Sequence, residues 1–260
     1  MTDTLHITMI QAPIVWENRE ENLSRFGRLL RRASGKTHLA VLPEMFTTGF
    51  SMNVEALADT ADGTTVATLK AWAKEYRMAI AGSFIAEEED RYYNRAFFVT
   101  PEGDVAYYDK RHLFSMAGEN NYFTPGSQQT LVHYLGWNIC LQICYDLRFP
   151  VWSRNVHNAY DLLIYVANWP ETRIGAWQAL LPARAVENLA YVCAVNRTGT
   201  DGKGHGYGGR SVIISPKGEI LADAGTEAEA VCTCTVSRSR LKGLRTRFPA
   251  WMDADTFILR

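Results

Sequence analysis

Three residues of types that support covalent catalysis stand at the predicted ends of separate β-strands. Glu44 follows the apolar segment 37–43, Lys110 follows 104–109, and Cys144 closes the segment that begins at 137. A thiol can attack a carbonyl carbon if a nearby base takes its proton, and a cation can stabilise the oxyanion that forms. Because α/β folds build their sites at the carboxyl ends of strands, the sequence predicts that these three side chains meet.

The segment around Cys144 has the pattern of a nucleophile elbow, a sharp corner between a strand and a helix. The apolar run stops at Cys144, and polar residues with Pro150 then open a predicted helix. At such a corner the thiol faces a cleft, and the Tyr145 backbone N–H and the helix N-terminus favour a thiolate or an oxyanion. The alternative is a small buried core residue, as most free cysteines are. Glu44 and Lys110, which singly are better explained as solvated charges, favour the elbow when all three are considered together.

The composition describes a globular protein with a large core and no excess charge. Of 260 residues, 47% are hydrophobic, and 27 basic residues are balanced by 28 acidic ones. The lack of a basic block argues against a nucleic-acid partner or an anionic membrane surface, and no apolar run approaches the ~20 residues of a membrane span. The first residues lack the pattern of a signal peptide, so we expect a cytoplasmic protein whose five cysteines are reduced.

The predicted elements alternate in a way that is typical of α/β proteins with added hairpins. Strands are predicted over 5–11, 37–43, 78–85, 92–99, 104–109, 129–135, 137–144, 161–168, 191–196, 211–215, 219–222 and 230–236. Helical spacing occurs around 23–30, 66–76, 150–158 and 174–189, and a basic helix begins at about 237. No linker or low-complexity tract divides the chain, so residues 1–260 are expected to form one domain. We expect two stacked mixed sheets with helices outside them.

Three motifs, in this order and at these separations, resemble the nitrilase or carbon–nitrogen hydrolase superfamily. They are Leu42-Pro-Glu44, then Lys110-Arg-His-Leu-Phe114 followed by Gly118-Glu119, then Cys144-Tyr-Asp-Leu-Arg-Phe-Pro150. The similarity extends over nearly the whole chain, through 168–170, 184–188, 191–197 and 209–211. It implies an αββα sandwich that pairs with a second copy into a four-layer αββα–αββα homodimer. The resemblance places the tail 248–259, whose apolar groups a monomer would expose, at the subunit contact.

The resemblance also implies a role for each residue of the site. Glu44 would be the general base, Lys110 and the Tyr145 N–H would face the oxyanion, Cys144 would be the nucleophile, and Glu119 matches a supporting glutamate. The implied reaction is attack on an amide carbon, loss of ammonia, and hydrolysis of the resulting thioester by water. A carboxylate is ordinarily a weak base, but a desolvated pocket strengthens it. No metal or other cofactor is expected, since the histidines and cysteines lack ligand spacing.

One branch of the superfamily matches best. The motif that begins at Cys144, together with Asn168-Trp-Pro170, resembles the ω-amidases, whose members deamidate 2-oxoglutaramate and 2-oxosuccinamate, and residues 151–154 are most similar to the bacterial enzymes. Many relatives carry Glu where this chain has Val151 and an acidic loop where it has 115–117, which leaves the substrate geometry open. The alternatives are another amidase or carbamoylase of the superfamily and a catalytically silent dimeric scaffold.

Three further residues are candidates for binding a dicarboxylate monoamide. Arg148, four residues beyond the nucleophile, could bind the free carboxylate, or it could instead pair with Asp146 or with a carbonyl group. Trp169 and Phe46 could form walls of the pocket, although each could equally be a core residue. The glycine-rich stretch 202–209 fits no nucleotide-binding motif and is interpreted as a mobile loop near the pocket.

Overall fold

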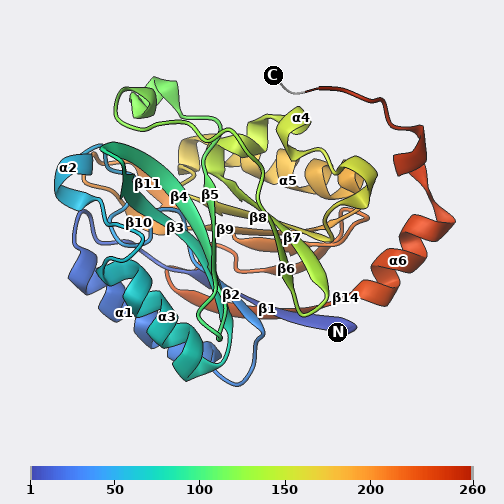
Figure 1. Ribbon diagram of the computed structural model, residues 1–260, viewed down its shortest axis with the longest axis horizontal. Helices are drawn as coiled ribbons and strands as arrows, with labels where there is room; N and C mark the ends of the chain where they lie inside the picture. The colour runs from blue at the N-terminus through green and yellow to red at the C-terminus, as the bar shows by residue number, and fades with distance from the viewer. Residues whose placement is uncertain (1, 259–260) are drawn as a thin grey trace.

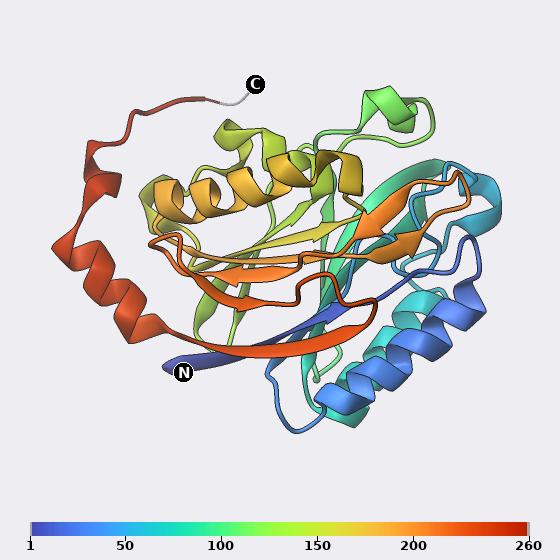
Figure 2. The same cartoon turned by 180° about the vertical axis from the view of Figure 1, so that it is seen from behind.

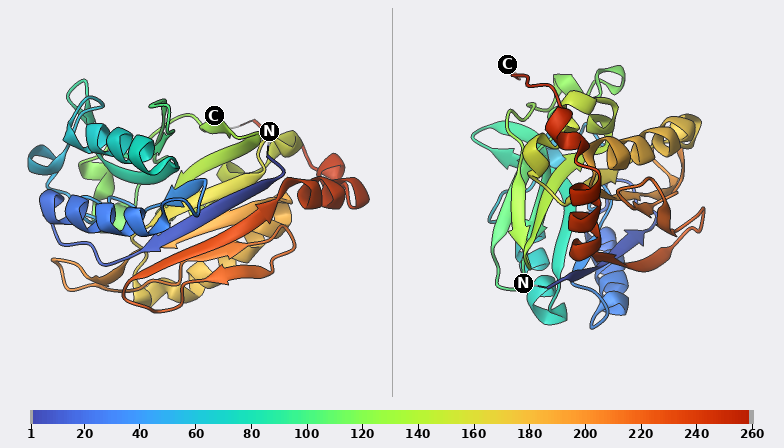
Figure 3. Two further views of the ribbon diagram at one scale, coloured as in Figure 1. Left: turned by 90° about the horizontal axis from the view of Figure 1, so that it is seen from below. Right: turned by 90° about the vertical axis from the view of Figure 1, so that its right-hand side faces the viewer.

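Residues 2–258 of the computed structural model form two stacked β-sheets with helices on their outer faces (Figure 1). Each sheet has six strands and contains both parallel and antiparallel neighbours. Helices α1 (Arg19–Ala33) and α3 (Thr64–Tyr76) lie on one outer face, and α5 (Ile174–Asn188) lies on the opposite one (Figure 2; Figure 3, left). The predicted αββα sandwich is therefore confirmed.

The first sheet has the strand order β14-β1-β2-β3-β4-β5. Its strands are β1 (Thr4–Gln11), β2 (Leu39–Val41), β3 (Ala79–Glu88), β4 (Arg91–Val99), β5 (Val105–Asp109) and β14 (Ala230–Ser237). β1, β2 and β3 are parallel, whereas β14, β4 and β5 pair antiparallel with their neighbours. The predicted β-α-β-α-β start and its two hairpins are present. α1 begins where the Asn18 side chain accepts the Glu21 backbone N–H at 3.0 Å, which satisfies one of the unpaired donors of the first turn.

The second sheet repeats this plan with the order β13-β12-β9-β8-β7-β6. Its strands are β6 (Leu131–Tyr134), β7 (Trp137–Ile143), β8 (Leu162–Ala167), β9 (Tyr191–Asn196), β12 (Val212–Ile214) and β13 (Ile220–Asp223). β7, β8 and β9 are parallel, so the ends of β7 and β8 open at one edge of the sheet. A separate hairpin of β10 (Thr198–Thr200) and β11 (Gly206–Gly208) follows β9.

Three layers of buried side chains hold the strands in place. The main core lies between the sheets and includes Met9 from the first sheet and Ile164 from the second. Phe26 of α1 and Leu69 of α3 belong to a second cluster on the outer face of the first sheet, and Trp177 of α5 belongs to a third on the second sheet. Because both faces of each sheet are covered, the residues at the strand ends stand on a rigid base.

The predicted helix over 150–158 is wrong as a single element. The chain forms a short α4 (Pro150–Ser153) and a 3₁₀ turn η4 (Val156–Asn158), with extended backbone at Arg154 between them. The cause is Asn155, whose side chain donates to the Tyr160 carbonyl at 2.9 Å and accepts the Tyr160 N–H at 3.0 Å. Such local hydrogen bonds offer the backbone an alternative to the helix.

The remaining short elements lie in the loops and at the C-terminus. They are α2 (Val54–Leu57), η1 (Ser115–Ala117), η2 (Glu119–Asn121), η3 (Cys144–Arg148), η5 (Glu171–Arg173), α6 (Arg238–Arg247) and η6 (Ala250–Asp253). α6 is the predicted basic helix, and it leads into an irregular tail along one side of the molecule (Figure 3). Leu259, the last residue of the predicted apolar tail, lies outside the described residues. None of the helices within residues 2–258 is both long and apolar enough to cross a membrane.

Candidate active site

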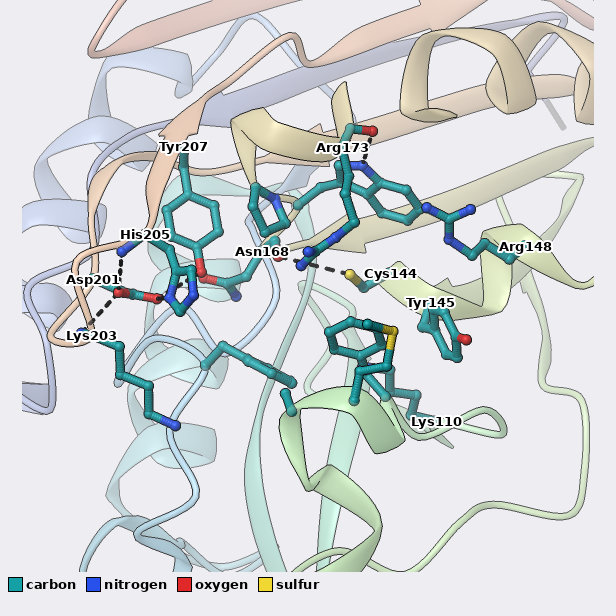
Figure 4. Close-up of a pocket in the computed structure, with 16 residues that line it drawn as sticks. Lys110, Cys144, Tyr145, Arg148, Asn168, Arg173, Asp201, Lys203, His205 and Tyr207 are labelled. Atoms are coloured by element: carbon teal, nitrogen blue, oxygen red, sulfur yellow. Dashed lines mark hydrogen bonds and ion pairs between the residues drawn. The ribbon is translucent and has the colours of Figure 1, made fainter. Parts of the chain in front are cut away.

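The loops after β2, β5 and β7 bring Glu44, Lys110 and Cys144 together beside one cavity. β2 and β5 belong to the first sheet and β7 to the second, so the site lies where the two sheets meet. The cavity has a volume of about 250 Å³, and Lys110 and Cys144 are among its walls (Figure 4). Glu44 is 0% exposed and lies behind Lys110, with which it forms a salt bridge.

Lys110 holds two glutamates in a buried cluster. Its Nζ donates to Glu44 Oε1 at 2.9 Å and to both Glu119 oxygens at 3.0 Å. Glu44 Oε2 accepts the Asn168 backbone N–H at 2.7 Å, and Glu119 Oε2 accepts the Phe114 backbone N–H at 2.6 Å. Because all three charged side chains are buried, each charge depends on these partners for its stability.

Burial and the neighbouring charges act in opposite directions on the ionisation of these groups. Burial alone lowers the pKa of Lys110, but the Glu119 and Glu44 carboxylates more than offset it and hold that pKa above its ordinary value. Burial raises the pKa of Glu119, which Lys110 opposes and Glu44 reinforces. Burial raises the pKa of the Cys144 thiol well above its usual range, the Glu44 carboxylate adds to the rise, and Lys110 opposes it. The surroundings of Cys144 therefore favour the neutral thiol over the thiolate.

The backbone at Cys144 has the strained geometry of a nucleophile elbow. Its φ angle is +42°, in the left-handed region that side chains other than glycine rarely adopt. The 3₁₀ helix η3 begins at Cys144 itself and precedes Pro150, where the predicted helix was to begin, so the turn at the corner starts earlier than predicted. The sulfur lies 4.0 Å from the Asn168 carbonyl oxygen and lines the cavity, as does Tyr145.

Asp146 ties the elbow to the segment that carries the lysine. Its Oδ2 accepts the Ile143 backbone N–H at 3.1 Å and the Tyr108 hydroxyl at 2.7 Å. Its Oδ1 accepts the backbone N–H of His112 at 2.9 Å and lies 2.8 Å from the Nδ1 atom of the same residue. This carboxylate thus fixes Cys144 relative to Lys110, and sequence reasoning considered it only as a partner for Arg148.

Two arginine side chains line the cavity without a carboxylate partner among residues 2–258. The Arg148 guanidinium lies 5.1 Å from the ring centre of Trp169, and the Arg173 guanidinium lies 5.1 Å from that of Phe114. Stacking on a ring fixes each cation in place and leaves its N–H groups available to a ligand. The predicted alternative in which Arg148 pairs with Asp146 is absent. Arg173 was not predicted, because nothing in the sequence separates it from a surface arginine.

The aromatic walls of the cavity differ in part from those predicted. Trp169 lines the cavity while most of its ring is buried, and its Nε1 donates to the Arg173 carbonyl at 2.8 Å. Phe46 does not line the cavity, which corrects its place in the predicted pocket. It is 0% exposed and packs edge-on against Phe26 in the core beneath α1. Phe50, four residues later, forms the wall instead.

The glycine-rich stretch lies at the cavity, as predicted, and forms the turn and second strand of the β10–β11 hairpin. Tyr207 donates its hydroxyl to Asp201 Oδ2 at 2.9 Å, and the Asp201 carboxylate also accepts the backbone N–H groups of Lys203 and His205 at 2.9 Å (Figure 4). These bonds give the loop a defined shape, and its mobility stays a prediction. No group of three metal-ligating side chains occurs within residues 2–258.

Comparison with known proteins identifies the family. Residues 6–246 match the family model described as carbon-nitrogen hydrolase. The chain belongs to the carbon–nitrogen hydrolase family. This hydrolase is 46% identical to an omega-amidase of Escherichia coli strain K12 over 255 residues, which cover 98% of each chain. It is 32% identical to the 2-oxoglutaramate amidase of Bacillus subtilis over 251 residues, 95% of this chain and 96% of that one.

A solved structure agrees with this family. It is a CN-hydrolase superfamily protein from Xanthomonas campestris with an arsenic adduct in its active site. The two chains superpose with a TM-score of 0.96 and 41% identity, and each is covered completely. The carbon–nitrogen hydrolase described here is thus an enzyme that hydrolyses C–N bonds, and its fold is the nitrilase-type sandwich predicted from the sequence.

Proposed function

We propose that this hydrolase removes the ω-amide nitrogen of small dicarboxylate monoamides, such as 2-oxoglutaramate or 2-oxosuccinamate, as ammonia. The observation that carries the proposal is one cavity whose walls combine Cys144 and Lys110 with the guanidinium groups of Arg148 and Arg173, neither of which has a carboxylate partner within residues 2–258. The similarity to an omega-amidase and to a 2-oxoglutaramate amidase supports it.

The first half-reaction forms a thioester on Cys144. The thiol gives its proton to Glu44 while sulfur bonds to the amide carbon and the carbonyl electron pair moves to oxygen. The Lys110 ammonium and the Tyr145 N–H stabilise this oxyanion. When the carbonyl re-forms, the C–N bond breaks and the Glu44 carboxyl returns its proton to the departing nitrogen. Ammonia leaves, and Glu44 is again a carboxylate.

The second half-reaction returns the enzyme to its starting state. Glu44 takes a proton from water as the water oxygen attacks the thioester carbon, and the same oxyanion stabilisation applies. The C–S bond then breaks, and the proton on Glu44 passes to the Cys144 sulfur, so a carboxylic acid leaves. Glu119 acts through Lys110, since its carboxylate holds the ammonium in position at 3.0 Å.

Charge complementarity supports the choice of substrate class. A dicarboxylate monoamide keeps one free carboxylate, and Arg148 and Arg173 supply cations in the wall of the cavity that contains the nucleophile. An arginine fork matches the geometry of a carboxylate with two parallel hydrogen bonds. A neutral amide would leave these cations without a partner in a partly desolvated site, which makes it the poorer ligand.

A release assay for ammonia tests the proposal with four compounds: 2-oxoglutaramate, glutamine, a neutral five-carbon amide and the matching nitrile. We expect the oxo acid amide to react fastest and the nitrile slowest, because the protonated Glu44 carboxyl fits a leaving amine. Equal rates for acid and neutral amides would remove the carboxylate argument. Faster turnover of the nitrile would move the protein to the nitrilases, and a failure of electrophiles to trap Cys144 would favour the silent scaffold.

We further propose that two copies associate through the C-terminal tail. Its apolar side chains are exposed in the single chain, for example Phe248 at 60% and Ile258 at 88%. Exposed apolar side chains that gather in one segment are typical of a surface that a partner covers. Isologous pairing through this segment would produce the four-layer assembly.

A further inference from the structure

Asn94 contacts all three charged residues of the buried cluster. It lies on β4 and is 0% exposed. Its Nδ2 donates to Glu44 Oε1 at 2.7 Å and to Glu119 Oε1 at 3.2 Å, and its backbone carbonyl accepts the Lys110 N–H at 3.0 Å. An amide nitrogen has two protons, so the two carboxylates occupy its full donor capacity.

The orientation of this amide is fixed by a closed ring of hydrogen bonds. The Met45 backbone N–H donates to Ser83 Oγ at 2.9 Å, and Ser83 Oγ donates to Asn94 Oδ1 at 3.0 Å. Asn94 donates to Glu44, and the peptide bond between Glu44 and Met45 closes the ring. A flipped amide would place its oxygen against two carboxylate oxygens, which is repulsive, so the donor face of Asn94 must point at the glutamates.

The ring makes the two oxygens of Glu44 unequal. Among the described residues, Oε1 accepts from both Lys110 and Asn94, whereas Oε2 accepts the Asn168 backbone N–H at 2.7 Å. Both oxygens of Glu119 already accept two donors each, from Lys110 together with Asn94 or Phe114. Spare acceptor capacity for a proton therefore remains on Glu44 Oε2.

We infer that Asn94, oriented by Ser83, is a positioning residue that occupies Glu44 Oε1 and thereby makes Oε2 the oxygen that takes the thiol proton. In that step one proton moves from the Cys144 sulfur to Oε2, the sulfur pair bonds to the amide carbon, and the carbonyl pair moves to oxygen. The inference rests on the proposed function for its chemistry. Its geometry holds for any substrate of this site.

Two substitutions of Asn94 should move the pH dependence in opposite directions. Asn94→Leu removes the donors to both glutamates at similar volume, so their protonated forms gain stability relative to the carboxylates. The apparent pKa on the acid side of the kcat/KM profile should rise by about 1 to 2 pH units. The value of kcat at the optimum pH should fall about 10- to 100-fold. Asn94→Asp can donate only while it is protonated, so its activity should be confined to low pH and lost as pH rises.

The experiment measures kcat/KM against pH for the intact enzyme and these variants, with Asn155→Leu as the matched control. Asn155 is also a buried asparagine with amide hydrogen bonds, but its partners are Tyr160 and Asn188. The control should lose stability and keep the pH profile of the wild type. A folded Asn94→Leu enzyme with the wild-type profile and kcat would overturn the inference.

Alkylation of Cys144 by iodoacetamide gives a second readout that needs no substrate. Because Glu44 assists loss of the thiol proton, the pH at which alkylation accelerates should rise in Asn94→Leu and stay unchanged in Asn155→Leu. If Asn94→Leu fails to fold, Ser83→Ala replaces it. This change removes the hydrogen bond that orients the Asn94 amide, together with the acceptor of the Met45 N–H, and keeps both Asn94 donors, so it should shift both pH profiles in the same direction by less. If neither the kcat/KM profile nor the alkylation profile shifts in the variant that folds, the inference is refuted. Absence of ammonia release from every amide, with the alkylation shift present, would refute only the proposed function.

Discussion

Replacement of Arg148 by methionine tests how the substrate carboxylate is bound. The guanidinium lies over Trp169, 5.1 Å from the ring centre, with no carboxylate partner among the described residues. Methionine keeps the unbranched apolar stem against the indole and removes the charge. The change should therefore act on ligand binding and leave the elbow in place, since Asp146 and not Arg148 anchors that segment.

The size of the effect follows from the hydrogen bond that is lost. A hydrogen bond between charged groups contributes about 1.5–3 kcal/mol, so kcat/KM for an acid substrate should fall roughly 10- to 150-fold. Arg173 on the same wall should keep the loss in Arg148→Met below that of a double Arg148→Met, Arg173→Met variant, because one cation remains. A neutral amide of equal length should be barely affected. Binding lost equally from substrate and transition state raises KM and leaves kcat unchanged.

The assay is ammonia release from 2-oxoglutaramate and from a neutral five-carbon amide, with both kcat and KM determined. Arg154→Met is the control, because Arg154 donates to the Glu187 carbonyl and does not line the cavity. Equal losses on both substrates would assign Arg148 a structural role. Unchanged kinetics on the acid substrate would show that the carboxylate is bound elsewhere.

Four other predictions test the remaining parts of the site and fold. Cys144→Ala should abolish turnover and keep the fold, and mass spectrometry with a slow amide should show the wild-type acyl adduct on Cys144 and not on Cys140. Glu44→Gln and Lys110→Met should each cost several orders of magnitude in kcat, and the double variant far less than their product; multiplicative losses would argue against a shared site. Burial raises the pKa of Cys140 from 9.0 to about 12. Between these two pH values the unfolded chain binds fewer protons than the folded one, so the free energy of unfolding should fall by up to about 4 kcal/mol as the pH rises from 9.0 to about 12. Cys140→Ala should reduce that decline in chemical denaturation. Sedimentation at micromolar concentration should show a dimer, and a species of one chain's mass alone would contradict the assembly proposed for the tail.

The parts of the fold that sequence reasoning predicted are those set by short-range patterns. Alternating and helical spacing of apolar residues determines which face each element buries. The strands predicted from this spacing match nearly every strand of both sheets. Glu44, Lys110 and Cys144, which sequence reasoning placed at strand ends, come together in the structure where the two sheets meet. Dimerisation and a cytoplasmic location stay predictions, since a single chain tests neither.

Phe46 shows what short-range patterns leave undecided. The sequence left a pocket wall and a core position equally open for this residue, and the structure places it in the core: its backbone N–H donates to the Ser83 carbonyl of β3 at 3.1 Å. This bond continues the pairing of the sheet beyond β2 and turns the ring into the core beneath α1. The chain leaves the sheet only later, through Gly49 at φ +76°, and Phe50 then reaches the cavity. The deciding bond joins residues 37 positions apart, and nothing in the sequence near Phe46 encodes it.

Asn94, which sequence reasoning left unassigned, and Cys144, which it assigned, are both unfavourable in their local conformation. Asparagine is disfavoured in strands, yet Asn94 occupies the buried interior of β4. Cysteine rarely adopts a positive φ, yet Cys144 holds +42° at the end of β7. In each case a residue that weakens its own element persists because the fold around it is stable enough to impose the conformation, and the resulting side chain faces the site. A buried polar residue inside an aromatic strand is therefore a signal worth testing for a site; within 91–99 it marks Asn94 and Arg95, and the contacts of Asn94 with Glu44 and Glu119 distinguish it from Arg95, whose partners are Glu88 and Asp109.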